Sequence, residues 1–242
     1  MYINLLLRSF LAARDFSQAA ALLSKVRFPE AASTAQLVRF SFYTGRVKAV
    51  QLEYSDAYES FQAAARKVPP TARALSIAIT AFLSVVQLLM GDLPDRRSLS
   101  PPALAPYLAI VRAVRSGELA RFRALVEVTA PLFDRHGTLT LIRRLEANVI
   151  KAGLRRIAAA YSCISFADVA ARLHVGSVED AEFLAAKAVR DGVLEATLDH
   201  TAGTLVRAPP PLPPLTLLHD SDPYTPPSLP LTALLLRILA RQ

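Results

Sequence analysis

Apolar side chains recur every three or four residues along most of the chain, the spacing that places them on one face of a helix. Strict alternation, the pattern of a half-buried strand, is confined to a short stretch near residue 195. The chain is therefore expected to be mainly α, with helices paired as hairpins in a solenoid. The predicted helices span residues 3–14, 16–26, 34–50, 54–68, 74–90, 107–115, 120–133 and 138–161, and any bend in the last one is expected near Gly153.

The third and fourth predicted helices carry a more specific pattern. Their small and large residues have the spacing of a tetratricopeptide-type (TPR-like) repeat. These residues are Gly45, Ala57, Phe61, Ala64 and Pro69. Phe61 is expected to fill the space between the two helices. Ordinary antiparallel packing predicts nearly the same shape, so the pattern indicates helical hairpins rather than a repeat count.

Residues 164–206 follow the order helix, turn, helix and two short strands, which is the order of a winged helix. Ser165 and Ser177 precede the two helices, where a hydroxyl oxygen can accept from free backbone N–H groups. Gly192 follows the second helix and is expected at positive φ, the conformation that ends many helices. The sequence thus predicts a helical solenoid followed by a winged-helix module.

The helix predicted over residues 74–90 is long and free of charge, so its length nearly suits a membrane span. Polar residues nevertheless recur on one side of it: Ser76, Thr80, Ser84 and Gln87. Such a stripe favours a helix that is packed on most of its sides inside a protein. A membrane is therefore not expected as a partner.

Charge bears on the choice between protein and nucleic acid as partner. The net charge of +8 over 242 residues comes mostly from scattered arginines, with one denser group at Arg143, Arg144, Lys151, Arg155 and Arg156. A winged helix suggests DNA, but its second helix is expected to be acidic through Glu179, Asp180, Glu182 and Asp191. Phosphates would repel such a helix. Nucleic acid is therefore a secondary alternative.

Catalytic chemistry has little support in the sequence. The four histidines, His136, His174, His200 and His219, lie in unrelated contexts, and no metal-ligand spacing or phosphate-binding glycine loop is found. We expect no enzyme activity, no metal and no cofactor. The single cysteine, Cys163, is interpreted as a small, half-buried apolar residue rather than a nucleophile.

Four segments, in order and at their spacing, resemble the PCI-domain family, the scaffold module of the proteasome lid, the signalosome and translation initiation factor three. They are YTGRVKAVQLEYSDAY (43–58), GDLPDR (91–96), NVIKAGLRRIAAAYSCISFADVAARL (148–173) and EDAEFLAAKAVRDGVLEA (179–196). Within the family, the stronger resemblance is to a subunit of the 26S proteasome regulatory-particle lid.

The resemblance implies a non-catalytic scaffold that supports ubiquitin-dependent protein degradation through PCI–PCI contacts with other lid subunits. It also implies a location in the cytoplasm and nucleus. The alternatives are a nucleic-acid-binding winged-helix protein and a PCI subunit of the signalosome or the initiation factor.

The resemblance also sets expectations for the domains. A helical solenoid is expected over residues 1–135 and the C-terminal part of the PCI domain, with the winged helix, over 136–206. Compared with the family, an earlier part of the solenoid is expected to be absent, and the similarity stops after Val206. Residues 207–242 hold nine of the 17 prolines and are expected to be an altered, extended or disordered tail.

The two predicted strands, 193–198 and 204–206, are expected to pair as an antiparallel two-stranded sheet. A short unpaired edge is a template for another strand. The sequence therefore predicts that a partner protein adds to this edge or stacks beside it. The candidate interface residues are Val193, Leu194, Glu195, Ala196, Thr197, Leu198, Thr204, Leu205 and Val206.

Overall fold

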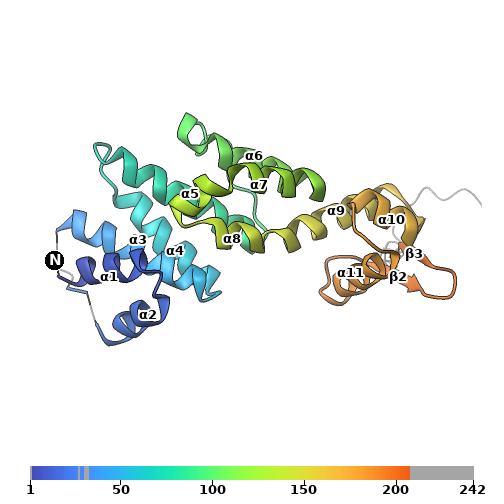
Figure 1. Cartoon of the computed structure of the whole chain (residues 1–242), viewed down its shortest axis with the longest axis horizontal. Coiled ribbons are helices and arrows are strands. Elements are labelled where there is room, and N and C mark those ends of the chain that lie inside the picture. Colours follow the sequence, from blue (N-terminus) through green and yellow to red (C-terminus); the bar gives the residue numbers. More distant parts are fainter. Residues whose placement is uncertain (1, 27, 30–32, 208–242) are drawn as a thin grey trace, which may run out of the picture. The chain divides into compact units, whose positions relative to one another are not determined.

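The computed structural model describes residues 2–26, 28–29 and 33–207 (Figure 1). Contacts divide the chain into one unit of residues 1–208 and another of residues 209–242, and every described residue belongs to the first. The predicted proline-rich tail therefore lies outside the described residues, apart from Arg207, which belongs to a strand.

The described part of the chain is mainly helical, and the helices form where the apolar periodicity predicts them. They are α1 (Tyr2–Ala12), α2 (Phe16–Lys25), α3 (Thr34–Val50), α4 (Tyr54–Lys67), α5 (Arg73–Met90), η1 (a 3-10 turn, Pro102–Leu104), α6 (Ala105–Ser116), α7 (Leu119–His136), α8 (Leu139–Arg144) and α9 (Glu146–Ala160). The helix predicted over 138–161 is two helices. The break lies at Leu145 and not at Gly153. There the Leu145 N–H donates to the carbonyl of Ile142, three residues back, and the Leu145 side chain is fully buried.

Helices α3 and α4 form the predicted hairpin, and Phe61 is fully buried within it. Gly45 leaves the room that the ring occupies, because a Cβ there would lie 2.8 Å from a ring carbon of Phe61. The rings of Phe42 and Phe82 lie 6.0 Å and 5.6 Å from that of Phe61, centroid to centroid. The repeat-like pattern of small and large residues thus marks a real close contact between two helices.

Helix α5 contributes Phe82 to this cluster and lies in the main hydrophobic core, which runs from Val38 to Val149. By length and composition alone, α5 could cross a membrane. Two hydroxyls of its polar stripe bond within the helix: Thr80 donates to the carbonyl of Ser76 and Ser84 to that of Thr80, at 2.9 and 2.8 Å. The helix packs against α4 on one side and contacts α6 and α8.

Helix α9 belongs to two cores. Val149 is buried in the main core, whereas Leu154 is buried in a second core that continues to Leu205. The second core lies under α10 (Phe166–Leu173), α11 (Val178–Arg190) and three strands, β1 (Cys163–Ser165), β2 (Ala196–Asp199) and β3 (Thr204–Arg207). This is the predicted winged-helix module, with one strand more than the sequence predicts.

We predict that Phe61→Ala lowers the free energy of unfolding by about 3–5 kcal/mol, because it removes a fully buried ring and leaves a cavity. Chemical denaturation followed by circular dichroism measures the change. Phe183→Ala is the matched control, because that ring is 68% exposed and its loss should cost less than about 1 kcal/mol. Equal losses from both variants would contradict the assigned core.

Candidate protein-interaction surface

Local capping interactions position the two helices of the winged-helix module. The Ser165 hydroxyl accepts from the backbone N–H of Asp168 at 3.2 Å, and the Ser177 hydroxyl accepts from that of Asp180 at 3.0 Å. Both bonds satisfy donors that a helix start leaves unpaired. At the end of α11, Gly192 adopts φ +67°, as the sequence predicts.

The sheet has three strands in the order β1–β3–β2, all antiparallel to their neighbours. The predicted two-stranded sheet is therefore wrong in one respect, because β3 is the central strand and pairs on both sides. Cys163, Ile164 and Ser165 form the additional strand. The open edges are accordingly those of β1 and β2, and the residues of β3 cannot accept a further strand.

The backbone hydrogen bonds show which residues of β3 direct their N–H and C=O groups toward β1. Arg207 donates its N–H to the carbonyl of Ser162 at 2.8 Å, and Phe166 donates to the carbonyl of Gly203 at 2.9 Å. Backbone polar groups alternate in direction along a strand. Leu205 lies two residues from both Gly203 and Arg207, so its N–H and C=O groups also point toward β1.

It follows that Val206, one residue further on, directs its backbone toward β2. Its partner there is Thr197, whose N–H and C=O groups must therefore point toward β3. The neighbouring residues of β2, Ala196 and Leu198, then direct their N–H and C=O groups away from β3, to the open edge. These two residues offer the backbone groups with which an added strand would pair.

The predicted interface residues thus divide into three groups. Ala196, Thr197 and Leu198 lie on the edge strand β2, whereas Thr204, Leu205 and Val206 lie on the central strand. The remaining three, Val193, Leu194 and Glu195, precede β2 and are not in a strand. The N–H groups of Val193 and Leu194 donate instead to the carbonyl of Ala188, at 2.9 and 3.3 Å, so the end of α11 holds them.

The sequence prediction missed part of the sheet. Asp199 and Arg207 extend β2 and β3 by one residue each, and β1 is a strand that the sequence does not predict. An apolar residue between two small ones, Cys163-Ile164-Ser165, is the only signal for β1, and it is too short to show alternation.

The two faces of the sheet differ in their side chains. The side chains of Ile164, Leu198 and Leu205 point into the core beneath the sheet. In the next row, the side chains of Cys163, Thr197 and Val206 point to solvent and are exposed. The interpretation of Cys163 as half-buried is therefore wrong, because its position in β1 turns it outward.

A tight turn joins β2 to β3 and is held by Asp199. Its Oδ1 accepts from the backbone N–H groups of Thr201 and Ala202, at 3.0 and 3.1 Å, and from the Thr201 hydroxyl at 2.7 Å. The Thr201 hydroxyl bond and the backbone bonds lower the pKa of Asp199, because they favour the carboxylate. Gly203 completes the turn at φ +64°.

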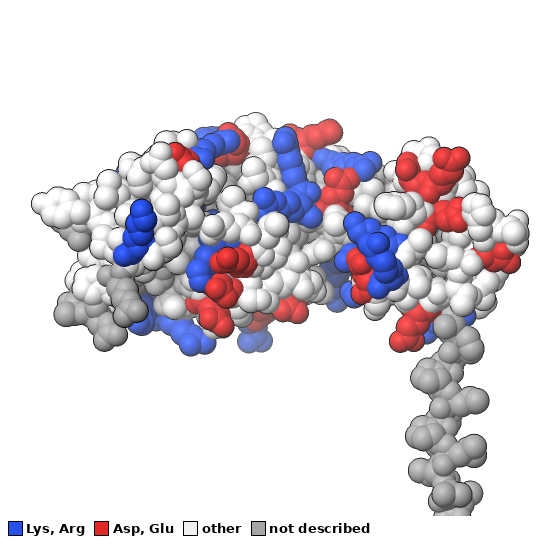
Figure 2. Space-filling model, turned by 90° about the horizontal axis from the view of Figure 1, so that it is seen from below, with Lys and Arg blue, Asp and Glu red and all other residues white. Residues whose placement is uncertain are grey.

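The winged-helix module is acidic, although the whole chain is basic. From residue 163 to residue 207 there are seven acidic side chains, Asp168, Glu179, Asp180, Glu182, Asp191, Glu195 and Asp199, against four basic ones, Arg172, Lys187, Arg190 and Arg207. On the face that Figure 2 shows, acidic side chains gather toward this end of the described chain, while both signs mix over the helices. Helix α11 also exposes two apolar side chains, Val178 and Phe183.

Several members of the predicted basic group serve structural contacts. Arg144 donates to the carbonyls of Ala49 and Val50, and Arg156 donates to the carbonyl of Ser116. Lys151 pairs with Asp191 at 3.0 Å, and this bond is the main cause that lowers the pKa of Asp191. Fewer side chains of this basic group are therefore free to contact phosphates than the sequence suggests.

The described histidines lie apart from one another. The His136 Nδ1 bonds the Tyr107 hydroxyl at 2.8 Å, and the His200 Nδ1 contacts a carboxylate oxygen of Glu182 at 2.7 Å. Within residues 2–26, 28–29 and 33–207, no three His, Cys, Asp or Glu side chains are close enough to hold a metal ion.

Family comparison agrees with this architecture. Residues 125–208 match the PCI domain, and residues 1–111 match PSMD3-like, N-terminal TPR repeats. Helical hairpins that lead into a winged helix are consistent with these two matches, which together cover most of the chain. The chain thus has a PCI domain preceded by a PSMD3-like TPR N-terminus.

Individual relatives point to one member of that family. The chain is 42% identical over 209 residues to the 26S proteasome non-ATPase regulatory subunit 3 of Dictyostelium discoideum. It is 43% identical over 211 residues to the probable subunit of the same name in Nicotiana tabacum, and 44% identical over 202 residues to that of Drosophila melanogaster. These alignments cover 84%, 84% and 81% of the chain, but 42%, 43% and 41% of the relatives. The chain thus spans less than half the length of these curated relatives.

We predict that Gly192→Ala destabilises the winged-helix module by about 1–2 kcal/mol, because a side chain disfavours the left-handed backbone at φ +67°. Gly176→Ala is the matched control: a Cβ on either glycine would meet no atom within 4 Å, and Gly176 is not at positive φ. Thermal melts of both variants measure the difference. A loss as large at Gly176 as at Gly192 would refute the backbone argument.

Proposed function

We propose that this chain is a non-catalytic scaffold of the 26S proteasome regulatory particle. It would support ubiquitin-dependent degradation through contacts of its PCI domain with other PCI subunits of the lid. The single observation that carries the proposal is the winged-helix sheet, whose edge strand β2 directs the backbone groups of Ala196 and Leu198 outward. The relatives named as proteasome regulatory subunits support it. From the same relationship we propose that the protein works in the cytoplasm and nucleus.

The edge of β2 suits the addition of a partner strand for two reasons. Its outward backbone groups would gain hydrogen bonds that no strand of the described sheet gives them. The Ala196 side chain beside these groups is small and nearly buried, and the Leu198 side chain points into the core beneath the sheet. A partner strand can therefore approach without meeting a bulky side chain.

Nucleic acid is a weaker candidate for the same module. Most of the affinity of a winged helix for DNA comes from basic groups that face phosphates. Here α11 presents Glu179, Asp180 and Glu182 in its first turns, next to the exposed ring of Phe183. An acidic helix with an exposed aromatic ring suits a protein surface better than a phosphate backbone.

We predict that Ala196→Pro weakens capture of co-expressed lid PCI subunits, because proline removes an outward N–H while the bonds between β2 and β3 stay in place. Cys163→Pro, on the opposite edge strand β1, is the matched control and should leave capture unchanged. Co-purification measures both, with circular dichroism to confirm equal helicity. Leu194→Pro is not a suitable test, because the N–H of Leu194 holds the end of α11.

Thr197→Lys provides a second variant that leaves every backbone group in place. An exposed lysine on an edge strand opposes strand addition by its charge and its hydration. It should weaken capture as Ala196→Pro does. If both variants are folded and capture the partner as well as the wild type does, the interface lies elsewhere than on β2.

Thiol labelling gives an independent measurement of the same edge. Cys163 is the only cysteine of the chain and is exposed on β1, so a maleimide should label it at the same rate in the free and partner-bound protein. A thiol placed at exposed Thr197 on β2, in a Cys163→Ser background, should be protected when the partner is bound. Protection of Cys163 instead would assign the contact to the opposite edge or to the outer face.

A further inference from the structure

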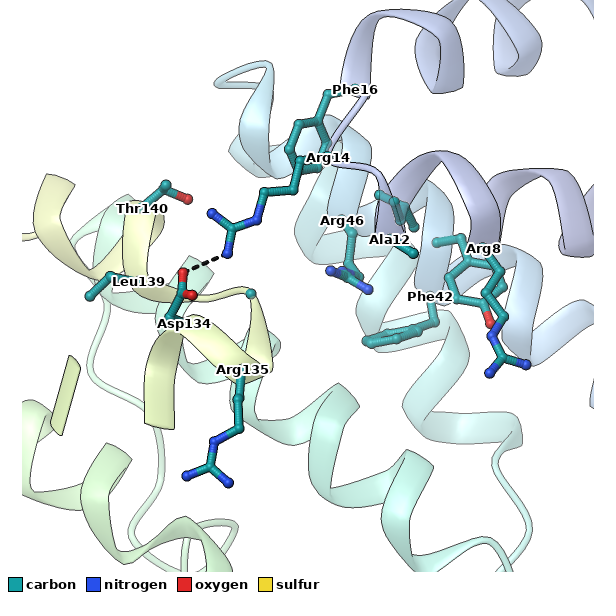
Figure 3. A pocket seen from close by; sticks show the side chains of 13 residues that line it. Arg8, Ala12, Arg14, Phe16, Phe42, Arg46, Asp134, Arg135, Leu139 and Thr140 are labelled. Atoms are coloured by element: carbon teal, nitrogen blue, oxygen red, sulfur yellow. Dashed lines mark hydrogen bonds and ion pairs between the residues drawn. The ribbon is translucent and has the colours of Figure 1, made fainter. Parts of the chain in front are cut away.

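A cavity of about 590 Å³ lies between the α1–α2 connection, α3 and the α7–α8 connection (Figure 3). Four of the side chains that line it are arginines, Arg8, Arg14, Arg46 and Arg135, and one is a carboxylate, Asp134. Its volume falls within the range of pockets that hold small molecules or a few side chains of a peptide, roughly 300–1,000 Å³. The charge of its walls is therefore strongly positive for so small a space.

Arg46 is the most unusual of the four arginines. Its side chain rises from α3 and is half-buried, with the guanidinium carbon 5.8 Å from the ring centre of Phe42 and 5.2 Å from that of Phe82. In the described part of the chain, no Asp or Glu oxygen lies within 4.0 Å of its guanidinium. Burial lowers the pKa of Arg46, yet a guanidinium stays charged at neutral pH. The aromatic faces offset part of the cost of its lost hydration.

The backbone around Arg46 leaves room for this guanidinium. Gly137, at the end of α7, has φ +73°, and a Cβ there would lie 2.8 Å from an Nη atom of Arg46. A glycine that ends one helix thus makes the space in which a charge from another helix lies.

Arg14 also lines the cavity and has an uncommon backbone conformation. It follows the end of α1 at φ +59°, where glycine or asparagine is usual. From there its guanidinium reaches across to Asp134 at 2.6 Å (Figure 3). Both side chains are more than half exposed, and such ion pairs contribute little and open readily. Asp134 can balance only one of the four positive charges.

We propose that this cavity binds an acidic segment of a partner protein, with a Glu or Asp carboxylate between Arg46 and Arg14. Guanidinium groups match carboxylates because their planar donors can form two parallel hydrogen bonds. The cavity also has apolar walls from Leu11 and Leu139, which suit an apolar side chain next to the acid. A hollow of this size takes a few side chains and does not follow a phosphate backbone, so a protein segment fits better than nucleic acid. This site is separate from the sheet edge and does not depend on it.

The test uses a short fluorescent peptide that alternates glutamate with leucine, and its glutamine–leucine counterpart as the uncharged probe. Fluorescence anisotropy should show that the acidic peptide binds the full chain and that the glutamine–leucine peptide binds it much more weakly. Arg46→Gln should weaken binding about tenfold, which corresponds to the loss of one charge-assisted contact. Arg39→Gln, an exposed position on the same helix, makes the same change in charge outside the cavity and should leave binding unchanged.

Arg135→Gln protects the test against misfolding of the Arg46 variant, because Arg135 is exposed and its substitution should leave the fold intact. It should also weaken binding several-fold. Equal binding by the wild type, Arg46→Gln and Arg135→Gln overturns the proposal, as does failure of the acidic peptide to bind. An oligothymidylate that binds more tightly than the peptide, and is weakened by the same variants, would assign the cavity to nucleic acid and overturn it too. Retention of peptide binding by Ala196→Pro would confirm that the two sites are independent.

Discussion

The close approach of two glycines is the contact on which the junction of the two cores depends. Gly117 ends α6 at φ +66°, and a Cβ on it would lie 2.4 Å from the backbone nitrogen of Gly153. A Cβ on Gly153 would in turn lie 2.7 Å from a methyl carbon of Leu173 and 2.8 Å from the carbonyl oxygen of Gly117. Glycine in mid-helix is normally unfavourable, so the cost at Gly153 is offset by this packing. The helix that carries Gly153 is shared by both cores, and the contact holds it against α6 and α10 at once.

The sequence predicts the helices well because their signal is local. A face of apolar residues that repeats over ten or more positions is unambiguous, and serine caps and glycine ends set the boundaries within a few residues. The fully buried Phe61 and the left-handed Gly192 follow from such local rules. The break at Leu145 does not, because leucine is a good helix former and no glycine or proline stands beside it.

The sheet and the cavity depend on contacts between distant parts of the chain. β1 exists as a strand only because β3, some forty residues later, supplies its partner. An open strand edge is therefore found at β2, whereas the edge expected at β3 is covered by β1. The arginines of the cavity come from α1, its connection to α2, α3 and α7, and nothing in their local sequences indicates that they meet. Charge patterns along a sequence cannot show such a cluster, since only the packing of hairpins brings it together.

Helix α5 has a consequence for how the protein is made. While it is being synthesised, a segment this apolar resembles a membrane anchor to the cell's targeting machinery. The chain emerges with its N-terminus first, so the residues of α3 and α4 leave the ribosome before those of α5. Phe42 and Phe61 then offer Phe82 a ready apolar surface. The order of the hairpins along the chain thus gives a nascent apolar helix a protein surface to bury itself on as it leaves the ribosome.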